Sequence, residues 1–276
     1  MKEYGFEQIA TALSTLIDQK LRAVEPQTMD LLRSALLCED NDYAKWAIDT
    51  IVKNGEKASE QNCYACQDCG VAIIFAFLGR DAKLTCSLEC AINEGVRRGY
   101  ENARKSVAHP LTRLNTGDNT PAVIYTEIVE GDGLTLSYLA KGAGSENMSQ
   151  VYMLTPSKGE DGVVKAVVDC VTTAGANPCP PLVLGVGIGG TMDKACVLSK
   201  KALLRETGTP SKDERVALLE RRILDAVNET GIGAQGLGGK TTALAVHIET
   251  FPTHIGMLPV AVTVQCHSVR HGSVTL

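Results

Sequence analysis

The stretch that most constrains the fold is residues 177–191, which read NPCPPLVLGVGIGGT. An apolar run of strand length, 182–186, is followed by closely spaced glycines and then by a helical pattern that begins at Thr191. Glycines let a chain or a ligand approach the backbone closely, and prolines fix the backbone beside Cys179 and remove amide donors there. We expect a strand that leads into a helix, with Cys179 presented on a stiff turn before the strand.

The cysteine content points to metal or catalytic chemistry. Cys179 by itself fits either a metal or cofactor ligand or a buried structural cysteine, because free cysteine packs as a small hydrophobe. The chain has ten cysteines, and in a reducing cytosol such a number favours metal binding or catalysis over disulfides. Cys63, Cys66 and Cys69 stand at two-residue gaps, as in the iron–sulfur run of bacterial ferredoxins. A ferredoxin needs its fourth cysteine within a few residues, and a zinc site needs a second close pair, and neither follows here.

Charge and composition argue against two classes of partner. The formal net charge is −5, the isoelectric point is near 5.6 and no basic run is present, so no nucleic-acid partner is expected. The first residues lack the basic and apolar regions of a secretory signal, and no apolar run reaches membrane-spanning length. We therefore expect a cytoplasmic protein without a membrane partner.

Apolar periodicity predicts an α/β fold. Apolar residues recur at helical spacing through residues 1–60, which predicts a helical N-terminal region. The remainder predicts a mixed sheet with packed helices, built from strands over 71–78, 123–128, 135–139, 182–186, 243–248 and 258–265 and helices over 163–171, 191–208 and 216–227. The EGDG sequence at 130–133 is a turn signal typical of a hairpin between the two strands that flank it. No sharp boundary, repeat or low-complexity tract interrupts the pattern, so we expect a single domain over 1–276.

Two glycine motifs resemble nucleotide-binding loops, but each misses a required residue. Gly185–Gly190 satisfies G-x-G-x-x-G between a strand and a helix, yet the acidic residue expected about 20 positions on is absent. Gly239–Thr241 matches the end of a Walker A loop, yet Ala234 stands where its first glycine belongs and no helical pattern follows. A nucleotide-binding enzyme therefore remains only as an alternative, while Lys240 and the amides of its loop suit an anionic substrate.

Six motifs in chain order carry a resemblance that none of them carries alone. They are CQD at 66–68, NTGDNTPA at 115–122, KGAGSEN at 141–147, NPCPP…GVGIGGT at 177–191, GIGAQGLGGKTTAL at 231–244 and QCH at 265–267. Together they resemble the class I fumarate hydratase and L-tartrate dehydratase family of iron–sulfur hydro-lyases, specifically its alpha subunit or N-terminal domain. The resemblance covers about residues 5–272, nearly the whole chain.

The resemblance implies a 4Fe–4S cluster held by three cysteines, here Cys66, Cys179 and Cys266. Three thiolates leave one iron with an open position, which is what Lewis-acid catalysis needs. Cys63 and Cys69 then become additional thiols, and the family usually has threonine at the position of Cys69. We expect these two thiols to pack passively, with replacement of a lost ligand as the alternative.

The implied reaction is the reversible addition of water to a carbon–carbon double bond of a small dicarboxylate. Fumarate to (S)-malate is the leading case, and L(+)-tartrate to oxaloacetate is the alternative. By the resemblance, Gln67 and Asp68 face the substrate, and Asp68 and His254 stand near the leaving hydroxyl. Arg104 matches an arginine that grips a substrate carboxylate, and Gly144 matches a backbone contact. Without the motif, His254 fits a structural histidine better than a catalytic one, and only the motif match raises the functional role to equal standing.

The resemblance also implies a partner. The family's C-terminal half carries the residue that abstracts the proton, and this sequence ends at Leu276. We therefore expect a beta subunit that completes the active site, a further pairing into a dimer of heterodimers, and poor turnover by the chain alone. The rival from another class is a non-catalytic iron–sulfur protein for electron transfer or sensing, which needs a fourth ligand such as Cys63 or Cys69.

Overall fold

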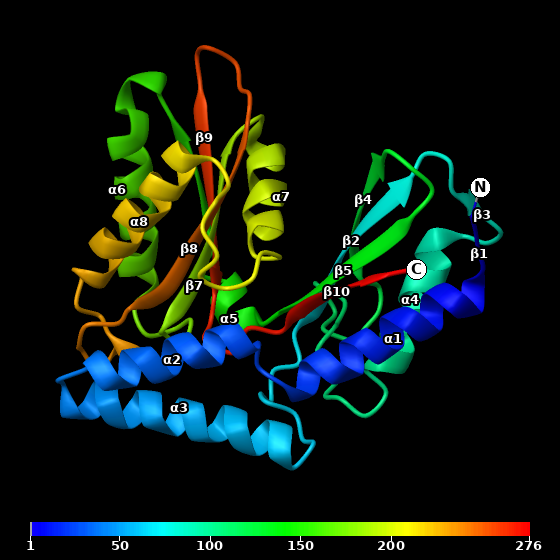
Figure 1. Cartoon of the computed structure of the whole chain (residues 1–276), viewed down its shortest axis with the longest axis horizontal. Coiled ribbons are helices and arrows are strands. Elements are labelled where there is room, and N and C mark those ends of the chain that lie inside the picture. Colours follow the sequence, from blue (N-terminus) through cyan, green and yellow to red (C-terminus); the bar gives the residue numbers. More distant parts are fainter. Residues whose placement is uncertain (1) are drawn as a thin grey trace. The chain divides into compact units, whose positions relative to one another are not determined.

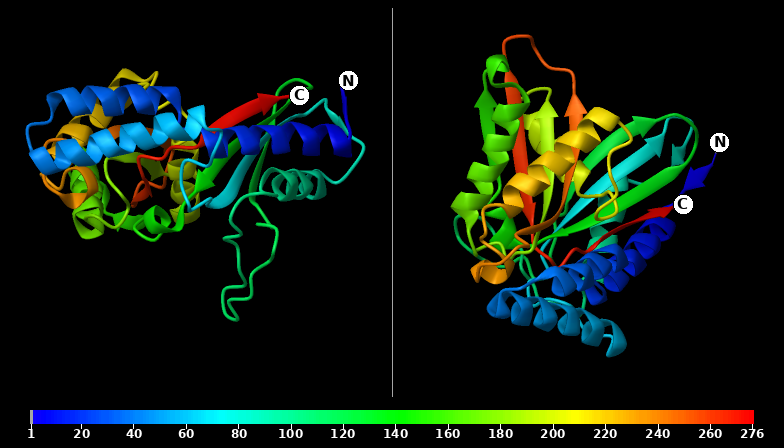
Figure 2. Two further views of the ribbon diagram at one scale, coloured as in Figure 1. Left: turned by 90° about the horizontal axis from the view of Figure 1, so that it is seen from below. Right: turned by 60° about the vertical axis from the view of Figure 1, so that its left-hand side comes forward.

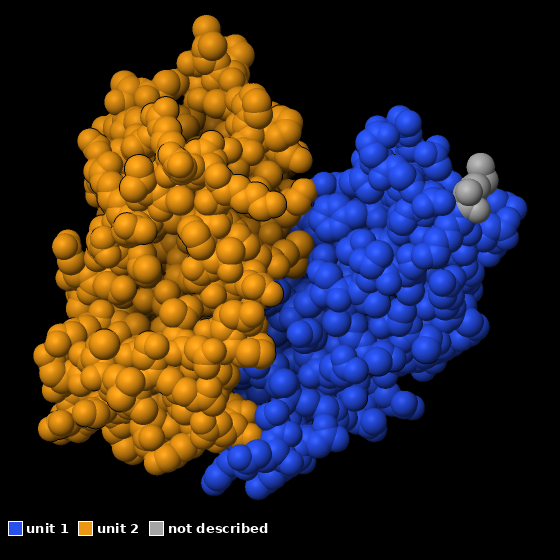
Figure 3. All heavy atoms as spheres, in the orientation of Figure 1, with its two compact units in different colours: residues 1–24, 57–143, 270–276 blue, residues 25–56, 144–269 orange. Residues whose placement is uncertain are grey.

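A computed structural model of the chain describes residues 2–276 (Figure 1). The chain divides into two compact units, which Figure 3 shows in different colours. Unit 1 is built from residues 2–24, 57–143 and 270–276, and unit 2 from residues 25–56 and 144–269. Each unit therefore combines segments that lie far apart in the sequence.

The helical N-terminal region is confirmed. Its helices are α1 (Phe6–Arg22), α2 (Pro26–Cys38) and α3 (Asp42–Glu60). Pro26 occupies the first turn of α2, where the missing amide proton costs no hydrogen bond. The side chain of Asn41 caps α3 by accepting hydrogen bonds from the amides of Tyr43 and Ala44, at 3.0 and 3.1 Å.

Unit 1 contains a four-stranded mixed sheet in the order β10-β5-β2-β4. The strands are β2 (Val71–Gly79), β4 (Val123–Val129), β5 (Leu134–Lys141) and β10 (His271–Thr275). Helices α1 and α4 (Leu88–Gly99) share a hydrophobic core with this sheet. The short strands β1 (Glu3–Tyr4) and β3 (Lys83–Leu84) pair with each other in parallel. The core explains why α1 forms, since it buries Ile9, Leu13 and Ile17 at helical spacing.

The predicted hairpin across residues 130–133 is wrong. Strand β2 lies between β4 and β5, parallel to β4 and antiparallel to β5. The EGDG segment does turn, but it passes around the end of β2, where the amide of Gly79 donates to the carbonyl of Gly133 at 2.7 Å. A Cβ on Gly79 would lie 2.4 Å from the carbonyl oxygen of Gly131, so glycine is required at this close crossing.

Unit 2 contains a second mixed sheet, in the order β6-β9-β7-β8. Its strands are β6 (Gln150–Leu154), β7 (Leu182–Gly189), β8 (Ala243–Phe251) and β9 (Leu258–Gln265). Helices α6 (Gly159–Ala174) and α8 (Glu214–Asn228) pack on one face, and α7 (Met192–Ala202) packs on the other (Figures 1 and 2). The shorter elements of this unit are η1 (Pro156–Lys158), η2 (Ala234–Gly236) and α5 (Ala143–Glu146), whose first residue belongs to unit 1.

The glycines of β7 serve the packing of a helix. A Cβ on Gly185 would lie 2.1 Å from the carbonyl oxygen of Ser199, and one on Gly187 would lie 2.0 Å from that of Ala195. Alternate residues of β7, Leu184 among them, point to the opposite face and pack with α6 and α8. The expected strand followed by a helix is therefore confirmed, and the chain rather than a ligand approaches these glycines.

Within residues 2–276, no helix has both the length and the apolar character needed to cross a membrane.

Candidate functional site

Unit 2 brings the Cys179 and Cys266 segments together at one end of its sheet. Strands β7 and β9 are antiparallel, with Val183 paired to Gln265, so the start of β7 adjoins the end of β9. Cys179 lies in the turn before β7, and Cys266 directly follows β9. The Nδ1 atom of His267 lies 2.9 Å from the carbonyl oxygen of Cys179, which joins the two segments directly. We call this end of unit 2 the thiol end.

Two glycine-rich loops border the turn at 176–181. Gln235 donates from its backbone amide and from Nε2 to the carbonyl of Pro180, at 2.9 and 2.7 Å. A Cβ on Gly236 would lie 2.5 Å from the Cβ of Ala176, and a Cβ on Gly144 would lie 3.4 Å from the carbonyl oxygen of Asn177. The segment at 144–147, which forms most of the short helix α5 instead of the expected loop, and the loop at 231–242 therefore both lie at the thiol end.

Lys240 in the second of these loops is already paired. Its backbone amide donates to Glu39 Oε2 at 2.9 Å, and its ammonium lies 2.6 Å from Asp40. The ion pair with Asp40 raises the pKa of Lys240. The structure therefore pairs Lys240 with an exposed carboxylate of this chain, and its binding of an anionic substrate stays a prediction.

Cys179 has an unusual backbone conformation and an exposed side chain. Its φ is +56°, in the left-handed region that costs an L-residue roughly 1–2 kcal/mol. Cysteine is among the residue types most often buried, and Cys170 in α6 follows that rule. An exposed thiol in a strained turn indicates a functional rather than a packing role.

The third proposed thiol lies in unit 1, on the loop before β2. Cys66 is half-buried, and its Sγ lies 3.5 Å from Oε1 of the exposed Gln67. The carboxylate of Asp68 is held by two backbone amides, from Gly70 to Oδ1 at 2.9 Å and from Ala143 to Oδ2 at 2.8 Å. Each oxygen of Asp68 keeps a further lone pair for a substrate or a proton.

Arg104 belongs to the same region of unit 1. Its backbone lies beside the Cys69 thiol, and its carbonyl accepts from Asn119 Nδ2 at 2.9 Å. It begins a long loop, residues 104–121, that extends away from the sheet of unit 1 (Figure 2). The Arg104 side chain is exposed, and within residues 2–276 no hydrogen bond or ion pair holds its guanidinium. The structure thus brings Arg104 near the loop that carries Cys66, Gln67 and Asp68, with its charge available.

The two additional thiols of this loop differ in exposure. Cys69 is 1% exposed in the core of unit 1, and burial raises the pKa of its thiol. Cys63 is exposed. A buried thiol with a raised pKa packs well and ligates poorly, because the ligand is the thiolate. Passive packing is therefore the better interpretation for Cys69.

The structure does not bring His254 to the thiol end. His254 lies in the loop between β8 and β9, and β9 begins after this loop and ends just before Cys266. Eight strand residues at about 3.3 Å each separate the two ends by roughly 25 Å. The Nδ1 of His254 accepts a hydrogen bond from the Gly256 amide at 3.0 Å, which is a turn-stabilising role. Within unit 2, the expected neighbourhood of His254 and the cluster thiols is therefore not found.

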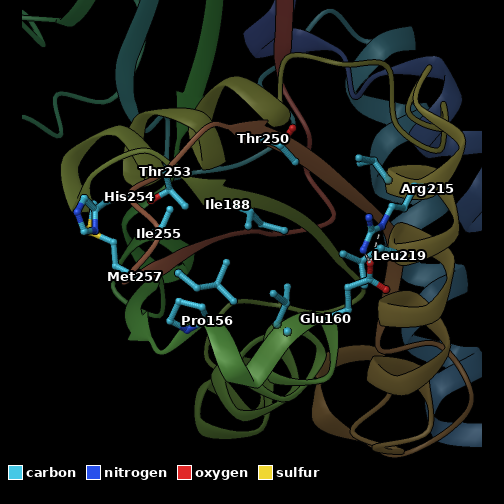
Figure 4. Close-up of a pocket in the computed structure, with 14 residues that line it drawn as sticks. Pro156, Glu160, Ile188, Arg215, Leu219, Thr250, Thr253, His254, Ile255 and Met257 are labelled. Atoms are coloured by element: carbon cyan, nitrogen blue, oxygen red, sulfur yellow. Dashed lines mark hydrogen bonds and ion pairs between the residues drawn. The ribbon is translucent and has the colours of Figure 1, made fainter.

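His254 instead borders an apolar pocket of about 420 Å³ (Figure 4). Ile188, Leu219 and Met257 contribute apolar walls, and an ion pair between Arg215 and Glu160, 2.8 Å long, stands on the other side in this view. None of the cysteines of residues 2–276 lines this pocket. It is therefore separate from the thiol end.

The donor chemistry at the thiol end fits an iron–sulfur cluster. None of the cysteines of residues 2–276 forms a disulfide. Beside Cys266, the side-chain amide of Gln265 is fully buried, and neither of its polar atoms has a hydrogen-bond partner within the described chain. Such an orphaned amide suits a polar group at the thiol end. Across residues 2–276, no three His, Cys, Asp or Glu side chains stand together as a metal site.

Sequence reasoning missed two residues of the thiol end. His267 links the Cys266 and Cys179 segments, and its position directly after the cysteine in QCH was the available signal. Gln235 holds the turn before β7, and it has a φ of +53°. A single polar residue among the glycines of GIGAQGLGG was the signal in that case.

Comparison with known proteins gives consistent matches over most of the chain. The family model described as fumarate hydratase matches residues 10–275. A protein of Methanocaldococcus jannaschii, provisionally named as the alpha subunit of L(+)-tartrate dehydratase, is 41% identical over 249 residues, covering 87% of each chain. The L(+)-tartrate dehydratase subunit alpha of Escherichia coli strain UTI89 is 33% identical over 251 residues, covering 89% of this chain and 83% of that protein. The protein of the same name from Shigella sonnei matches to the same extent.

Proposed function

Because this chain belongs to the fumarate hydratase family, we propose that it is the alpha subunit of a two-subunit hydro-lyase acting on a small dicarboxylate. The leading reaction is the reversible hydration of fumarate to (S)-malate. Dehydration of L(+)-tartrate to oxaloacetate is the second candidate, and the names of the relatives favour it. The observation that carries the proposal is the meeting of the Cys179 and Cys266 segments at one end of the unit 2 sheet.

We propose that Cys66, Cys179 and Cys266 hold a 4Fe–4S cluster. A cluster with three thiolate ligands supplies a Lewis acid at its open iron, which polarises the hydroxyl of the substrate. The exposure of Cys179, its strained backbone and the half-buried Cys266 support this assignment. The burial of Cys69 argues against its service as a fourth ligand, which leaves the exposed Cys63 as the fourth ligand that the electron-transfer alternative would need.

In this proposal Asp68 handles the proton of the leaving hydroxyl. In dehydration it donates a proton to the departing hydroxide, and in hydration it accepts one from water. Two backbone amides fix its carboxylate, so the proton is delivered from a defined position. The exposed Arg104 guanidinium binds a substrate carboxylate, for which its planar fork is suited. Gln67 and the backbone of Gly144 complete the substrate contacts that this chain contributes.

The proposal includes a partner. Reversible hydration also needs a group that removes the proton from carbon, and we assign that base to a beta subunit. The word alpha in the names of the relatives supports a second kind of chain. We further propose that two such pairs assemble into a dimer of heterodimers in the cytoplasm, where thiols stay reduced.

Iron and sulfide analysis after anaerobic reconstitution tests the cluster assignment. We expect about four irons per chain in the wild type, as in a 4Fe–4S protein, and loss of iron in Cys66→Ser, Cys179→Ser and Cys266→Ser. Cys90→Ser is the matched control, because Cys90 is an exposed thiol on α4 that is not a proposed ligand. The Cys90→Ser variant should therefore keep the full iron content. An iron-free wild type, or iron retained without one of the three thiols, would contradict the assignment.

Two further measurements separate the rival functions. A hydro-lyase should show a change in the cluster spectrum when the dicarboxylate is added, because substrate binds the open iron. An electron-transfer or sensing protein should show none. Titration with NAD or ATP tests the nucleotide-binding alternative, for which we expect no affinity.

A further inference from the structure

Two buried tyrosines form a directional hydrogen-bond chain that ends on the loop of Asp68. Tyr100, at the end of α4, and Tyr138, in β5, are both fully buried in the core of unit 1. The Tyr100 hydroxyl lies 3.1 Å from the carbonyl oxygen of Cys69 and 2.7 Å from the Tyr138 hydroxyl. A carbonyl has no proton to give, so Tyr100 donates to Cys69 and Tyr138 donates to Tyr100. The direction of the chain is therefore fixed.

Both hydroxyls keep their protons across the working pH range. Burial raises the pKa of Tyr100 and of Tyr138 well above the ordinary value. The chain is consequently a permanent donor to the Cys69 carbonyl rather than a titrating group.

The carbonyl of Cys69 and the amide of Gly70 belong to one peptide group. That amide donates to Asp68 Oδ1 at 2.9 Å, while the carbonyl accepts from Tyr100. A peptide group is planar and rigid, so a bond that fixes the direction of its C=O also fixes the direction of its N–H. A hydrogen bond to the carbonyl also strengthens the amide as a donor.

The neighbouring backbone restricts the orientation of the Cys69–Gly70 peptide group. Gly70 has a φ of +73°, and a Cβ there would lie 2.9 Å from the backbone of Lys141. A Cβ on Gly142 would lie 3.1 Å from Asp68 Oδ2, so this carboxylate oxygen is also closely bordered. The tyrosine chain approaches the peptide from the core, on the side away from the carboxylate.

We propose that Tyr100 is a positioning residue that sets the orientation of the Asp68 carboxylate through the Cys69–Gly70 peptide, with Tyr138 as its support. The proposal rests on the role given to Asp68 in the proposed function. A tyrosine that only fills the core would affect the stability of unit 1 and leave the loop at 66–70 unchanged.

Hydrogen exchange on the full chain tests the positioning role directly. In Tyr100→Phe we expect the amides of residues 66–70, and that of Gly70 above all, to exchange about fivefold to tenfold faster, as for the loss of one hydrogen bond. Tyr138→Phe removes only the supporting donor and should give a smaller acceleration. It also serves as the milder variant if Tyr100→Phe does not fold.

Tyr4→Phe is the matched control. Tyr4 is also fully buried in the core of unit 1 and donates to a backbone carbonyl, that of Asp132 at 2.8 Å. The Tyr4→Phe variant should lower the unfolding midpoint as much as Tyr100→Phe does, without altering hydrogen exchange of the amides at 66–70. Unchanged exchange in Tyr100→Phe, or equal acceleration in Tyr4→Phe, overturns the proposal, whether or not the chain holds a cluster.

Kinetics of the enzyme assembled with its partner distinguish this proposal from the proposed function. We expect Tyr100→Phe to lower kcat by about tenfold, with KM changed less than about twofold, because a misoriented acid affects the chemical step. If Asp68→Asn abolishes turnover while Tyr100→Phe leaves kcat intact, Tyr100 does not orient Asp68. If Asp68→Asn itself leaves kcat intact, the role proposed for Asp68 is wrong. In that case hydrogen exchange of the amides at 66–70 alone decides whether Tyr100 orients the Asp68 carboxylate.

Discussion

At the scale of single residues, the backbone of Cys179 sets this thiol apart from the other cysteines. The motif NPCPP indicated a stiff turn, but the sequence contained no sign that the cysteine itself adopts a positive φ. Glycine would adopt that conformation without strain, so the retention of a side chain there requires a reason. Ligation by the thiol supplies one.

The strain at Cys179 predicts an unusual order of stabilities. In the metal-free chain, Cys179→Gly should be about 1 kcal/mol more stable than Cys179→Ala, because glycine relieves the left-handed strain. Urea unfolding of both variants measures the difference. The same pair of substitutions at Cys90, inside α4, should give the opposite order, since glycine costs about 1 kcal/mol in a helix. The same order at both sites would show that Cys179 is not strained.

At the scale of elements, strand β7 packs very closely against helix α7 in unit 2. The sequence predicted both elements and suggested that the glycines admit a chain or a ligand. The structure shows that they admit the backbone of α7, because side chains on Gly185 and Gly187 would overlap its carbonyl oxygens. This arrangement also explains why G-x-G-x-x-G occurs here without the acidic residue of a dinucleotide site.

This contact predicts a severe effect of one added methyl group. Gly187→Ala places a Cβ 2.0 Å from the Ala195 carbonyl oxygen, so α7 must move, and we expect a loss of at least about 3 kcal/mol of unfolding free energy. Gly133→Ala is the control, because nothing lies within 4 Å of a Cβ there, and its change should stay within about 0.5 kcal/mol. Thermal unfolding of the two variants measures both. A stable Gly187→Ala chain would mean that α7 can pack farther from β7.

Helices α1 and α4 are joined by an ion-pair network that depends on pH. Arg98 lies 2.7 Å from Glu7 of α1 and 2.6 Å from Glu94 of α4, and Arg97 lies 2.7 Å from Glu94. Hydrogen bonds from these arginines lower the pKa of Glu94 from 4.5 to about 2. A carboxylate with a lowered pKa stabilises the folded state above its unfolded pKa, and that contribution is lost as pH falls from about 4.5 towards 2.

We therefore expect Glu94→Gln to reduce the unfolding free energy by about 1 kcal/mol at pH 7. This value already allows for the weakening of the ion pairs by solvent screening. The difference from wild type should shrink as the pH falls below 4.5, because wild-type Glu94 also becomes neutral. Urea unfolding at pH 7 and pH 3.5 measures this change. Glu60→Gln, an exposed residue at the end of α3, should match wild type at both pH values. A Glu94→Gln difference that persists at low pH would indicate lost packing instead of lost charge.

At the scale of the whole molecule, the residues proposed for the site come from both units. Cys66, Gln67, Asp68 and Arg104 belong to unit 1, and Gly144, Cys179 and Cys266 belong to unit 2. Among these side chains only Asp68 is a carboxylic acid suited to proton transfer. A reversible hydration needs a second such group, which is the physical reason to assign one to a partner chain.

The chain alone should therefore hold iron and turn over poorly. Adding the beta subunit to the reconstituted chain should raise the rate of fumarate or tartrate conversion by at least about 100-fold, the usual contribution of a general base. Initial rates with and without the partner, at equal iron content, measure the effect. Full turnover by the isolated chain would overturn the assignment of the base to a partner.

The sequence by itself determined the local elements and the chemistry of the thiols. The N-terminal helices, the predicted strands and the helix after Thr191 follow from apolar periodicity, which local side-chain spacing sets. Strands β6 and β10 escaped prediction because each is short and half-exposed, so its pattern is weak. Fold class and family could be inferred because both depend on residue types in order along the chain.

Only the tertiary structure decided which elements are neighbours. β2 separates β4 from β5, each unit is assembled from distant segments, and β9 carries His254 to the end of the sheet opposite Cys266. The reason is physical: strand order depends on contacts between residues far apart in the chain, and a turn signal reports only that the chain reverses. The peptide that joins Tyr100 to Asp68 was hidden for the same reason, since it connects side chains from three separate segments through one rigid plane.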